Sequence, residues 1–399
     1  MQGKKQLLNS TLAKGKGVFR LFPTWVPRSF CIPGRRLKLH PDDYYAFGVH
    51  RGGIDERWFA STTKADNGPL TLADEGLSYI FTGEGGADSK ILLKDAIELL
   101  GAEIIGDDLM KRYHGWPMYS KFFDNLEPLP LHLHLNDACA AKVSRKGKPE
   151  GYYFPLQLNN HPALFPHTYF GLNPGTTKDE VKKCLEQWHA RDNGILGLSK
   201  AYLLRPGTGW DVPPGVLHAP GSLLTYEPQF ASDVFSMFQN LTWNKFIPRD
   251  LLVKDVPEAR RADLDYIVDM VDWDLNLDPD FYAHRFLAPK PVKPIDEMHE
   301  CGYAEQRIVY GSDYFSAKEL TVRPKRSVVI QENGAYGAIV IQGHGKFGVL
   351  DVESPAMIRF GAMTSDEVFV TANAALDGVE IVNESATDDL VMLKHFAQG

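Results

Sequence analysis

The sequence is poor in cysteine: it has four in 399 residues, and none of them forms a Cys-x-x-Cys pair. This spacing excludes a zinc knuckle built on paired cysteines and indicates no disulfide framework. Such cysteine usage is typical of reducing compartments, so we expect a cytoplasmic protein. The four cysteines are Cys31, Cys139, Cys184 and Cys301.

Long apolar runs and an excess of basic residues are missing as well. No stretch approaches the roughly 20 apolar residues of a membrane-spanning helix, and the lysines near the N-terminus precede no signal-peptide core. A net charge of −8 argues against a broad nucleic-acid footprint, which needs a basic surface. We therefore expect neither a membrane nor a nucleic acid as a partner. A content of 44% apolar and 24% charged residues is typical of a globular protein.

Short strand signals dominate what is present. Runs of β-branched and aromatic residues alternate with clusters of Gly, Pro and Asp, which predicts a mainly β protein of sandwich or barrel type. At 399 residues the chain exceeds one ordinary core, so two domains are expected. The predicted strands are 44–50, 129–135, 152–158, 201–204, 223–226, 234–238, 314–322, 327–331, 338–342, 357–360, 367–371, 379–382 and 390–395.

Helix signals are few. A helix over 91–100 would end at Gly101, a favourable residue after a last helical turn. A second helix begins at Thr177, which has Glu180 three residues later in a capping-box pattern. Apolar residues at helical spacing predict a third helix over 257–273. We expect these helices to pack against the barrels and give them no chemical role.

A proline-rich segment over 288–294 marks the clearest boundary, because such a composition predicts a semi-rigid linker. The predicted units are a barrel with helical insertions over 1–245, a helical connector and linker over 246–300, and a second barrel over 301–399.

Two histidines share one face of a predicted strand. His132 and His134 alternate with leucines, and residues two apart on a strand point to the same side. In a small barrel that side is the interior, where uncompensated polar groups are costly and a metal ion would compensate them. The alternative is that the pair forms the exposed polar face of a half-buried sheet.

Two further residues favour the metal. Glu150 stands at the entry of an aromatic strand, directly after Lys148 and Pro149, and a Pro-Pro-Gly turn delivers His218 to a strand start. Three imidazoles and one carboxylate suit one divalent ion, zinc first, with manganese, iron, nickel and cobalt as alternatives.

The order of His-x-His, a later Glu and Pro-x-Gly-x-x-His resembles the metal-binding signatures of cupins. The sixteen-residue gap between His134 and Glu150, with Lys148 before the glutamate, resembles the type I mannose-6-phosphate isomerases. The likeness covers residues 50 to 245 and is only architectural after residue 300. It also rests on Glu56-x-Trp58-x-x-Ser61, on Lys121 and on Ser232-Asp233.

The resemblance implies two cupin, or jelly-roll-like, β-barrels, the second free of metal. It further implies metal ligands at His132, His134, Glu150 and His218, although that family usually has Gln where His132 stands. Lys148 matches an active-site lysine of the family, and Glu227 falls where the family has an acidic residue near the sugar.

Two positions depart from the family. Pro130 occupies the place of a phosphate-contacting serine and offers neither a hydroxyl nor an N–H. The family's arginine has no counterpart in 234–239, although Arg205 or Lys142 could replace it from elsewhere in the chain. Since phosphate recognition depends on fixed cations and donors, these losses argue against a phosphorylated substrate.

The leading hypothesis is a metal-dependent aldose–ketose isomerase acting on a small sugar or sugar derivative, which need not be phosphorylated. The metal would stabilise an enediolate, with Glu227 as the base and Lys148 holding a hydroxyl or the developing oxyanion. One alternative is a cupin dioxygenase or epimerase with the same ligand set. Another is a sugar-binding homologue without catalysis. The oligomeric state stays open.

Overall fold

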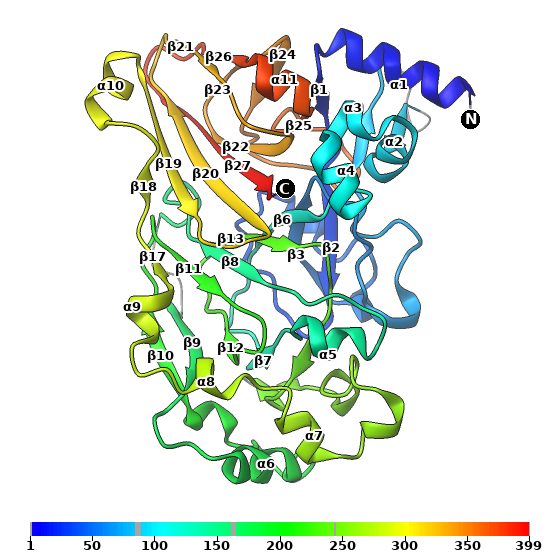
Figure 1. Cartoon of the computed structure of the whole chain (residues 1–399), viewed down its shortest axis with the longest axis vertical. Coiled ribbons are helices and arrows are strands. Elements are labelled where there is room, and N and C mark those ends of the chain that lie inside the picture. The colour runs from blue at the N-terminus through cyan, green and yellow to red at the C-terminus, as the bar shows by residue number, and fades with distance from the viewer. Residues whose placement is uncertain (1, 84–88, 161–164, 243–244, 399) are drawn as a thin grey trace.

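The computed structural model describes residues 2–83, 89–160, 165–242 and 245–398. Two β units are stacked along the long axis of the molecule (Figure 1). Each unit contributes one seven-stranded antiparallel sheet, and each has a second, smaller sheet. This mainly β architecture of sheets folded into two barrel-like units confirms the predicted fold class.

The first unit combines a seven-stranded and a five-stranded sheet. The first runs in the order β17 (Phe286–Leu287), β11 (Gly209–Val212), β8 (Glu150–Tyr153), β13 (Thr225–Phe230), β6 (Met118–Phe123), β3 (Gly53–Phe59) and β2 (Thr24–Arg28). The second runs in the order β10 (Ser199–Leu203), β9 (His167–Leu172), β12 (His218–Ala219), β7 (His132–Leu133) and β14 (Ser236–Met237).

The second unit includes a strand from near the N-terminus. Its large sheet runs in the order β1 (Val18–Arg20), β25 (Glu367–Val370), β22 (Tyr336–Gln342), β27 (Leu390–Ala397), β20 (Phe315–Val322), β19 (Tyr303–Val309) and β18 (Lys290–Pro291). Its small sheet runs in the order β21 (Ser327–Ile330), β26 (Val379–Asn383), β23 (His344–Phe347) and β24 (Leu350–Glu353). Two hairpins complete the strands: β4 (Tyr79–Phe81) with β5 (Lys90–Leu92), and β15 (Leu241–Thr242) with β16 (Lys245–Phe246).

Helices lie at the two ends and along the sides of the stack (Figure 1). Near the second unit are α1 (Gln2–Lys14), α2 (Leu93–Leu100), α3 (Ala102–Ile105), α4 (Asp107–Tyr113), α10 (Ile295–Glu300) and α11 (Ala372–Asp377). Near the first are α5 (Asp137–Ala141), α6 (Lys178–Glu186), α7 (Leu264–Val268), α8 (Trp273–Asn276) and α9 (Phe281–Arg285).

The two large sheets pack face to face, and strand alternation sends neighbouring side chains to different cores. In β27, Met392 points into the core of the second unit, whereas Leu393 joins the apolar cluster between the units. In β6, Phe122 faces that same cluster, and Lys121 faces the interior of the first unit. Alternate side chains along each of these strands therefore point either into the interior of their own unit or into the apolar core between the two large sheets.

Two predicted helices are confirmed in detail. The helix α2 ends at Gly101, whose φ of 50° lies in the left-handed region that favours glycine. At the start of α6 the Thr177 side chain accepts from the Glu180 N–H, and the Glu180 side chain accepts from the Thr177 N–H. Because these signals depend on local hydrogen bonds, they do not require the tertiary structure.

Other predicted elements were wrong. The segment 44–50 forms turns and the start of a 3₁₀ helix rather than a strand. The predicted helix over 257–273 is broken, because Asp263 and Asp272 cap two separate short helices with their side chains. The linker over 288–294 stays a prediction; within it, Lys290–Pro291 pairs with β19 as an edge strand, a position that tolerates proline. The segment 357–360 contributes only an isolated bridge at Ile358.

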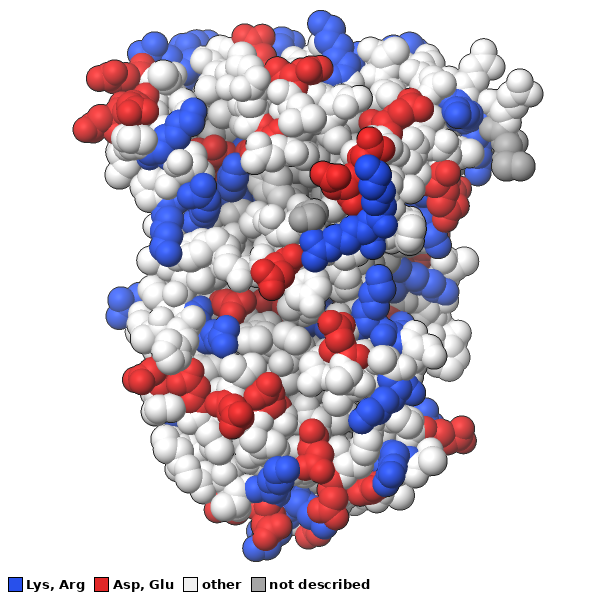
Figure 2. All heavy atoms as spheres, in the orientation of Figure 1, with Lys and Arg blue, Asp and Glu red and all other residues white. Residues whose placement is uncertain are grey.

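On the face shown in Figure 2, acidic and basic side chains are interspersed over both units. Among the described residues, no helix combines the length and the apolar character needed to cross a membrane.

Candidate metal centre

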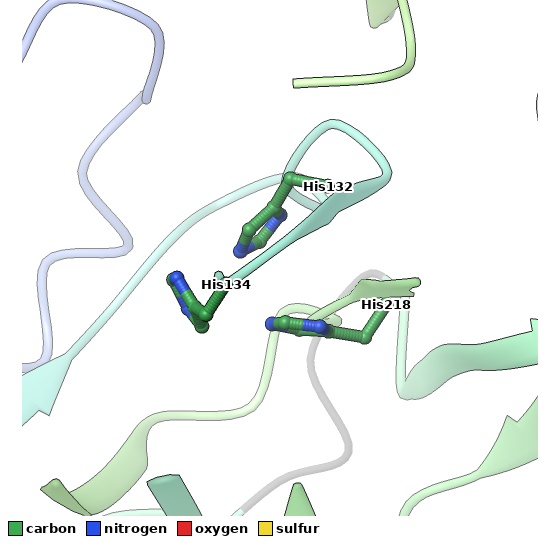
Figure 3. Close-up of side chains that lie close together, drawn as sticks. All are labelled: His132, His134 and His218. Atoms are coloured by element: carbon green, nitrogen blue, oxygen red, sulfur yellow. The ribbon is translucent and has the colours of Figure 1, made fainter. Parts of the chain in front are cut away.

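Three histidines converge in the interior of the first unit (Figure 3). His132 lies on β7 and His134 directly after it, while His218 lies on β12, where it is the register partner of His132. Their ligand atoms lie within 4.8 Å of one another, and all three side chains are buried. The intervening Leu131, Leu133 and Leu135 point the other way, into a core covered by α6 and α7. This is the arrangement that alternation along the strand predicts.

Backbone carbonyls fix the orientation of all three rings. The Nδ1 atoms of His132, His134 and His218 lie 2.8, 2.8 and 2.9 Å from the carbonyl oxygens of Pro130, Val234 and Val216. A carbonyl oxygen only accepts, so each Nδ1 carries the proton and each neutral ring keeps its lone pair on Nε2. Ligating histidines are commonly oriented in this way by a partner on the other ring nitrogen.

Glu150 at the start of β8 faces these lone pairs. Its Oε2 lies 2.9 Å from His134 Nε2, and its Oε1 lies 3.2 Å from His218 Nε2. With the proton on Nδ1, each of these contacts sets one acceptor against another. Lys148 Nζ relieves the first contact, because it lies 3.2 Å from both His134 Nε2 and Glu150 Oε2. Within the described chain, His218 Nε2 is buried and makes no hydrogen bond.

The protonation equilibria agree with neutral rings beside an ionised carboxylate. Burial lowers the pKa of His134 to about 4 and that of His132 well below its ordinary value. Burial alone would raise the pKa of Glu150, but the positive charge of Lys148, 3.2 Å from Oε2, lowers it and favours the ionised carboxylate. Neutral imidazole and ionised carboxylate are the forms that ligate metals.

The donor set fits a divalent ion. Three imidazole nitrogens and one carboxylate oxygen are ligands that zinc takes in four-coordinate sites, and manganese, iron, nickel and cobalt accept the same types. The three histidines form the group that could hold one ion, and Glu150, in contact with His134 and His218, stays the predicted fourth ligand. Tyr152 O–H donates to Glu150 Oε1 over 2.6 Å, which orients the carboxylate.

Glu227 lies beside this group, held by two lysines. Its Oε1 is 3.2 Å from Lys121 Nζ and 3.8 Å from Lys148 Nζ, and Lys148 Nζ is 3.2 Å from Glu150 Oε2. Burial, reinforced by the charge of Glu150, raises the pKa of Glu227 to about 8. A buried carboxyl with a pKa near neutrality can exchange protons at physiological pH.

Arg28, at the end of β2, was missed by the sequence analysis. Its guanidinium lines the same cavity and forms ion pairs with Glu56 Oε1 and Asp233 Oδ1, both over 3.2 Å. It comes from a strand about a hundred residues before the histidines, and no motif surrounds it. The suggested substitutes, Arg205 and Lys142, are exposed and do not line the cavity.

The cavity beside His132 and His134 has a volume of about 30 Å³ and a lining of both charged and apolar side chains. One water needs roughly 10–15 Å³ of cavity volume, so this cavity holds about two waters. The apolar part of its lining consists of Phe30, Phe123, Leu129, Pro220, Phe235 and Met237.

Known structures share this fold. No protein-family model and no curated protein matches the sequence. The mannose 6-phosphate isomerase from Bacillus subtilis has 16% identity and a TM-score of 0.63, covering 95% of this chain and 99% of that one. A mannosephosphate isomerase assigned as putative in Archaeoglobus fulgidus has 13% identity and a TM-score of 0.60, with coverages of 96% and 98%. A zinc-bound mannose 6-phosphate isomerase has 12% identity and a TM-score of 0.61, with coverages of 96% and 100%. At these identities the likeness shows the fold.

Proposed function

We propose that the chain is a metal-dependent aldose–ketose isomerase acting on a sugar without a phosphate group. The observation that carries the proposal is the convergence of three oriented, neutral imidazoles with Glu150, beside a carboxyl at Glu227 that is poised to exchange protons. The shared fold with mannose 6-phosphate isomerases supports the reaction class.

Aldose–ketose isomerisation moves one proton from C2 to C1 and another between the two oxygens. His132, His134, His218 and Glu150 would hold the ion, zinc first, which supplies polarisation of the carbonyl and the neighbouring hydroxyl. The Glu227 carboxylate would accept the C2 proton and return it to C1. The Lys148 ammonium, 3.8 Å from Glu227 Oε1, would donate a hydrogen bond to the sugar oxygen that gains negative charge.

The paired cations around the cavity support a substrate without phosphate. Among the described residues that line it, every lysine and arginine already faces a carboxylate: Arg28 faces Glu56 and Asp233, Lys121 faces Glu56 and Glu227, and Lys148 faces Glu150 and Glu227. A phosphate dianion would have to compete with these carboxylates. Pro130 uses its carbonyl to orient His132 and has no donor for a phosphate oxygen.

Solvent hydrogen exchange tests the reaction. The zinc-loaded protein is incubated in D₂O with free and phosphorylated aldoses and ketoses, and deuterium at C1 and C2 is followed by NMR. We expect exchange with a free sugar, its loss in Glu227→Gln and its loss after chelation. The control Glu353→Gln, at an exposed position of the second unit, should behave as wild type. Absence of exchange with every sugar would overturn the proposal.

The three-histidine ligand set also favours a second candidate, a metal-dependent dioxygenase. That function would appear as oxygen consumption by the iron-loaded protein, with no exchange at C2 of any sugar. Sugar binding without either reaction would instead indicate a non-catalytic homologue.

A further inference from the structure

A second hollow lies beside the metal cavity. It has a volume of about 490 Å³ and shares Phe30 and Phe235 with the cavity beside the histidines. Its remaining apolar wall is made by Pro69, Leu70 and Leu251. We call this hollow the side groove.

Phe30 lines both the side groove and the metal cavity. It lies in the turn after β2 and is partly exposed, with its ring 6.1 Å from that of Phe235 in an edge-on contact. On its other side it packs against Phe123 and Leu129 of the metal cavity. Because the described ring contacts of Phe30 are apolar, a change of its rotamer is the movement that would open the boundary it shares with Phe235.

A sugar can reach the histidines only if the metal cavity opens, because the cavity is smaller than a sugar ring. The 30 Å³ beside the histidines is too small for a sugar ring, which has about a dozen non-hydrogen atoms against the roughly two waters that fit there. The side groove is more than ten times larger and can receive a ring of its own. A substrate that reaches the metal past Phe30 would therefore extend into the side groove.

The lining of the side groove fits a neutral sugar. Arg51 Nη2 donates to Glu75 Oε1 over 2.8 Å and to Oε2 over 2.7 Å, and Lys254 pairs with Asp66 over 3.2 Å, so both cations already face carboxylates. A sugar ring presents C–H groups to apolar walls and hydroxyls to polar ones, and the groove offers both kinds of wall.

Hydrogen bonds also connect polar residues of the side groove with polar residues of the metal cavity. Arg28 Nη1 donates to Asn67 Oδ1 over 2.9 Å, and the Asp66 backbone N–H donates to Asp233 Oδ2 over 2.9 Å. Arg28 and Asp233 line the metal cavity, whereas Asp66 and Asn67 line the side groove. Hydroxyl groups along a bound chain would thus meet polar partners across the boundary.

We propose that the side groove is a subsite for a neutral sugar unit linked to the reacting sugar, so that the substrate is the reducing end of a neutral disaccharide or longer saccharide. The expected reaction of the saccharide rests on the proposed isomerase function. The expected binding of the second sugar unit rests on the side groove alone.

Matched tryptophan substitutions test the subsite. Leu70 is 58% exposed and lines the side groove, whereas Leu72 is 50% exposed and lies outside it. For the zinc-loaded protein we expect kcat/KM for maltose, cellobiose or mannobiose to exceed that for the free monosaccharide. We expect Leu70→Trp to lower this ratio about tenfold, the change for roughly one lost favourable contact. Leu72→Trp should leave the ratio unchanged.

Direct binding separates the two proposals. Calorimetric titration of the same three proteins with the disaccharides, the monosaccharides and inorganic phosphate needs no turnover. Disaccharide binding that is weakened only by Leu70→Trp, without reaction, would retain the subsite and reject the isomerase. Equal affinity or turnover for monosaccharides and disaccharides, an equal effect of both variants, or no disaccharide binding would overturn the subsite.

Discussion

The interiors of the two units both bury charged side chains, but they neutralise them differently. In the second unit Lys394 is fully buried on β27, and its Nζ lies 2.5 Å from Glu305 and 2.6 Å from Glu332. In the first unit Glu150 lies 2.9 Å from a neutral imidazole, His134, whose lone pair cannot neutralise it. The second interior pairs its carboxylates with lysines, whereas the first sets imidazole lone pairs against Glu150, even though Lys148 Nζ lies 3.2 Å from Glu150 Oε2.

The comparison shows how a buried polar cluster that only stabilises the fold differs from one that can bind a metal ion. Burying a charge is costly in either case, and an ion pair with satisfied geometry removes most of that cost. Around Lys394 the positive charge is covalently attached, and Lys318 adds a further contact to Glu332 over 2.5 Å. Around Glu150 the lone pairs of fixed rings converge beside Lys148, and we expect the folded chain to gain free energy when a metal ion binds there.

The largest expected effect is the loss of bound metal when two of the histidines are removed. His134→Ala combined with His218→Ala removes two of four donors, and each donor contributes about two orders of magnitude to zinc affinity. We expect metal measured by elemental analysis after dialysis to fall from about one ion per chain to a background level. His344→Ala, at an exposed histidine of the second unit, serves as the control. Zinc retained by the double variant would show that the ion binds elsewhere.

Breaking the ion-pair cluster of the second unit should destabilise the fold without releasing metal. Lys394→Met leaves Glu305 and Glu332 buried without their shared cation, which costs about 3–5 kcal/mol of unfolding free energy. Urea denaturation measures this loss. Adding Glu305→Gln and Glu332→Gln to the same chain should recover most of it, and failure to recover would contradict the electrostatic cause.

The tyrosine behind Glu150 should have a smaller effect on the metal. Tyr152→Phe removes the 2.6 Å hydrogen bond to Glu150 Oε1, and such supporting bonds are worth about 10–100-fold in metal affinity. The neighbouring Tyr153 points to the opposite face and donates to Glu319 Oε2 over 2.8 Å, so Tyr153→Phe should leave the affinity unchanged. Competition with a chelator of known zinc affinity compares the three proteins. Equal losses in both variants would argue against a specific role for Tyr152.

The smallest expected effect is a change in the pH dependence of stability when His395, at the boundary between the units, is replaced. His395 is fully buried there, with Nδ1 2.7 Å from Ser120 Oγ and 3.0 Å from Tyr226 Oη, and burial lowers its pKa to about 3. The unfolded chain takes up this proton below about pH 6.5, whereas the folded chain does not, so stability falls as the pH decreases from 6.5 towards 3.

This loss approaches about 1.4 kcal/mol per pH unit for one group, and it is absent above pH 6.5. Urea denaturation between pH 7 and pH 5 should show a weaker acid loss in His395→Gln than in wild type. Comparing the two proteins cancels the contributions of other titrating groups, including Glu367, whose pKa burial raises to about 8. Parallel pH profiles would show that His395 does not contribute.

Local patterns in the sequence predicted much of the fold class and of the candidate site. The cap at Gly101, the capping box at Thr177 and the shared face of His132 and His134 all follow from hydrogen bonds or alternation within a few residues. Predictions failed where context overrides the pattern. The apolar spacing over 257–273 suggested one helix, but two aspartates cap separate helices.

The sequence by itself determined that two imidazoles share a strand face, that a Pro-Pro-Gly turn precedes His218, and that Pro130 lacks a phosphate donor. These are consequences of backbone geometry and side-chain chemistry, which act locally. Only the tertiary structure decided that Glu150 faces the lone pairs of His134 and His218 and that Arg28 joins the cavity already paired with Asp233. It also decided that Phe30 lines both this cavity and the side groove. The physical reason is that ion pairing and cavity size depend on distances between strands far apart in the sequence, and no local pattern encodes those distances.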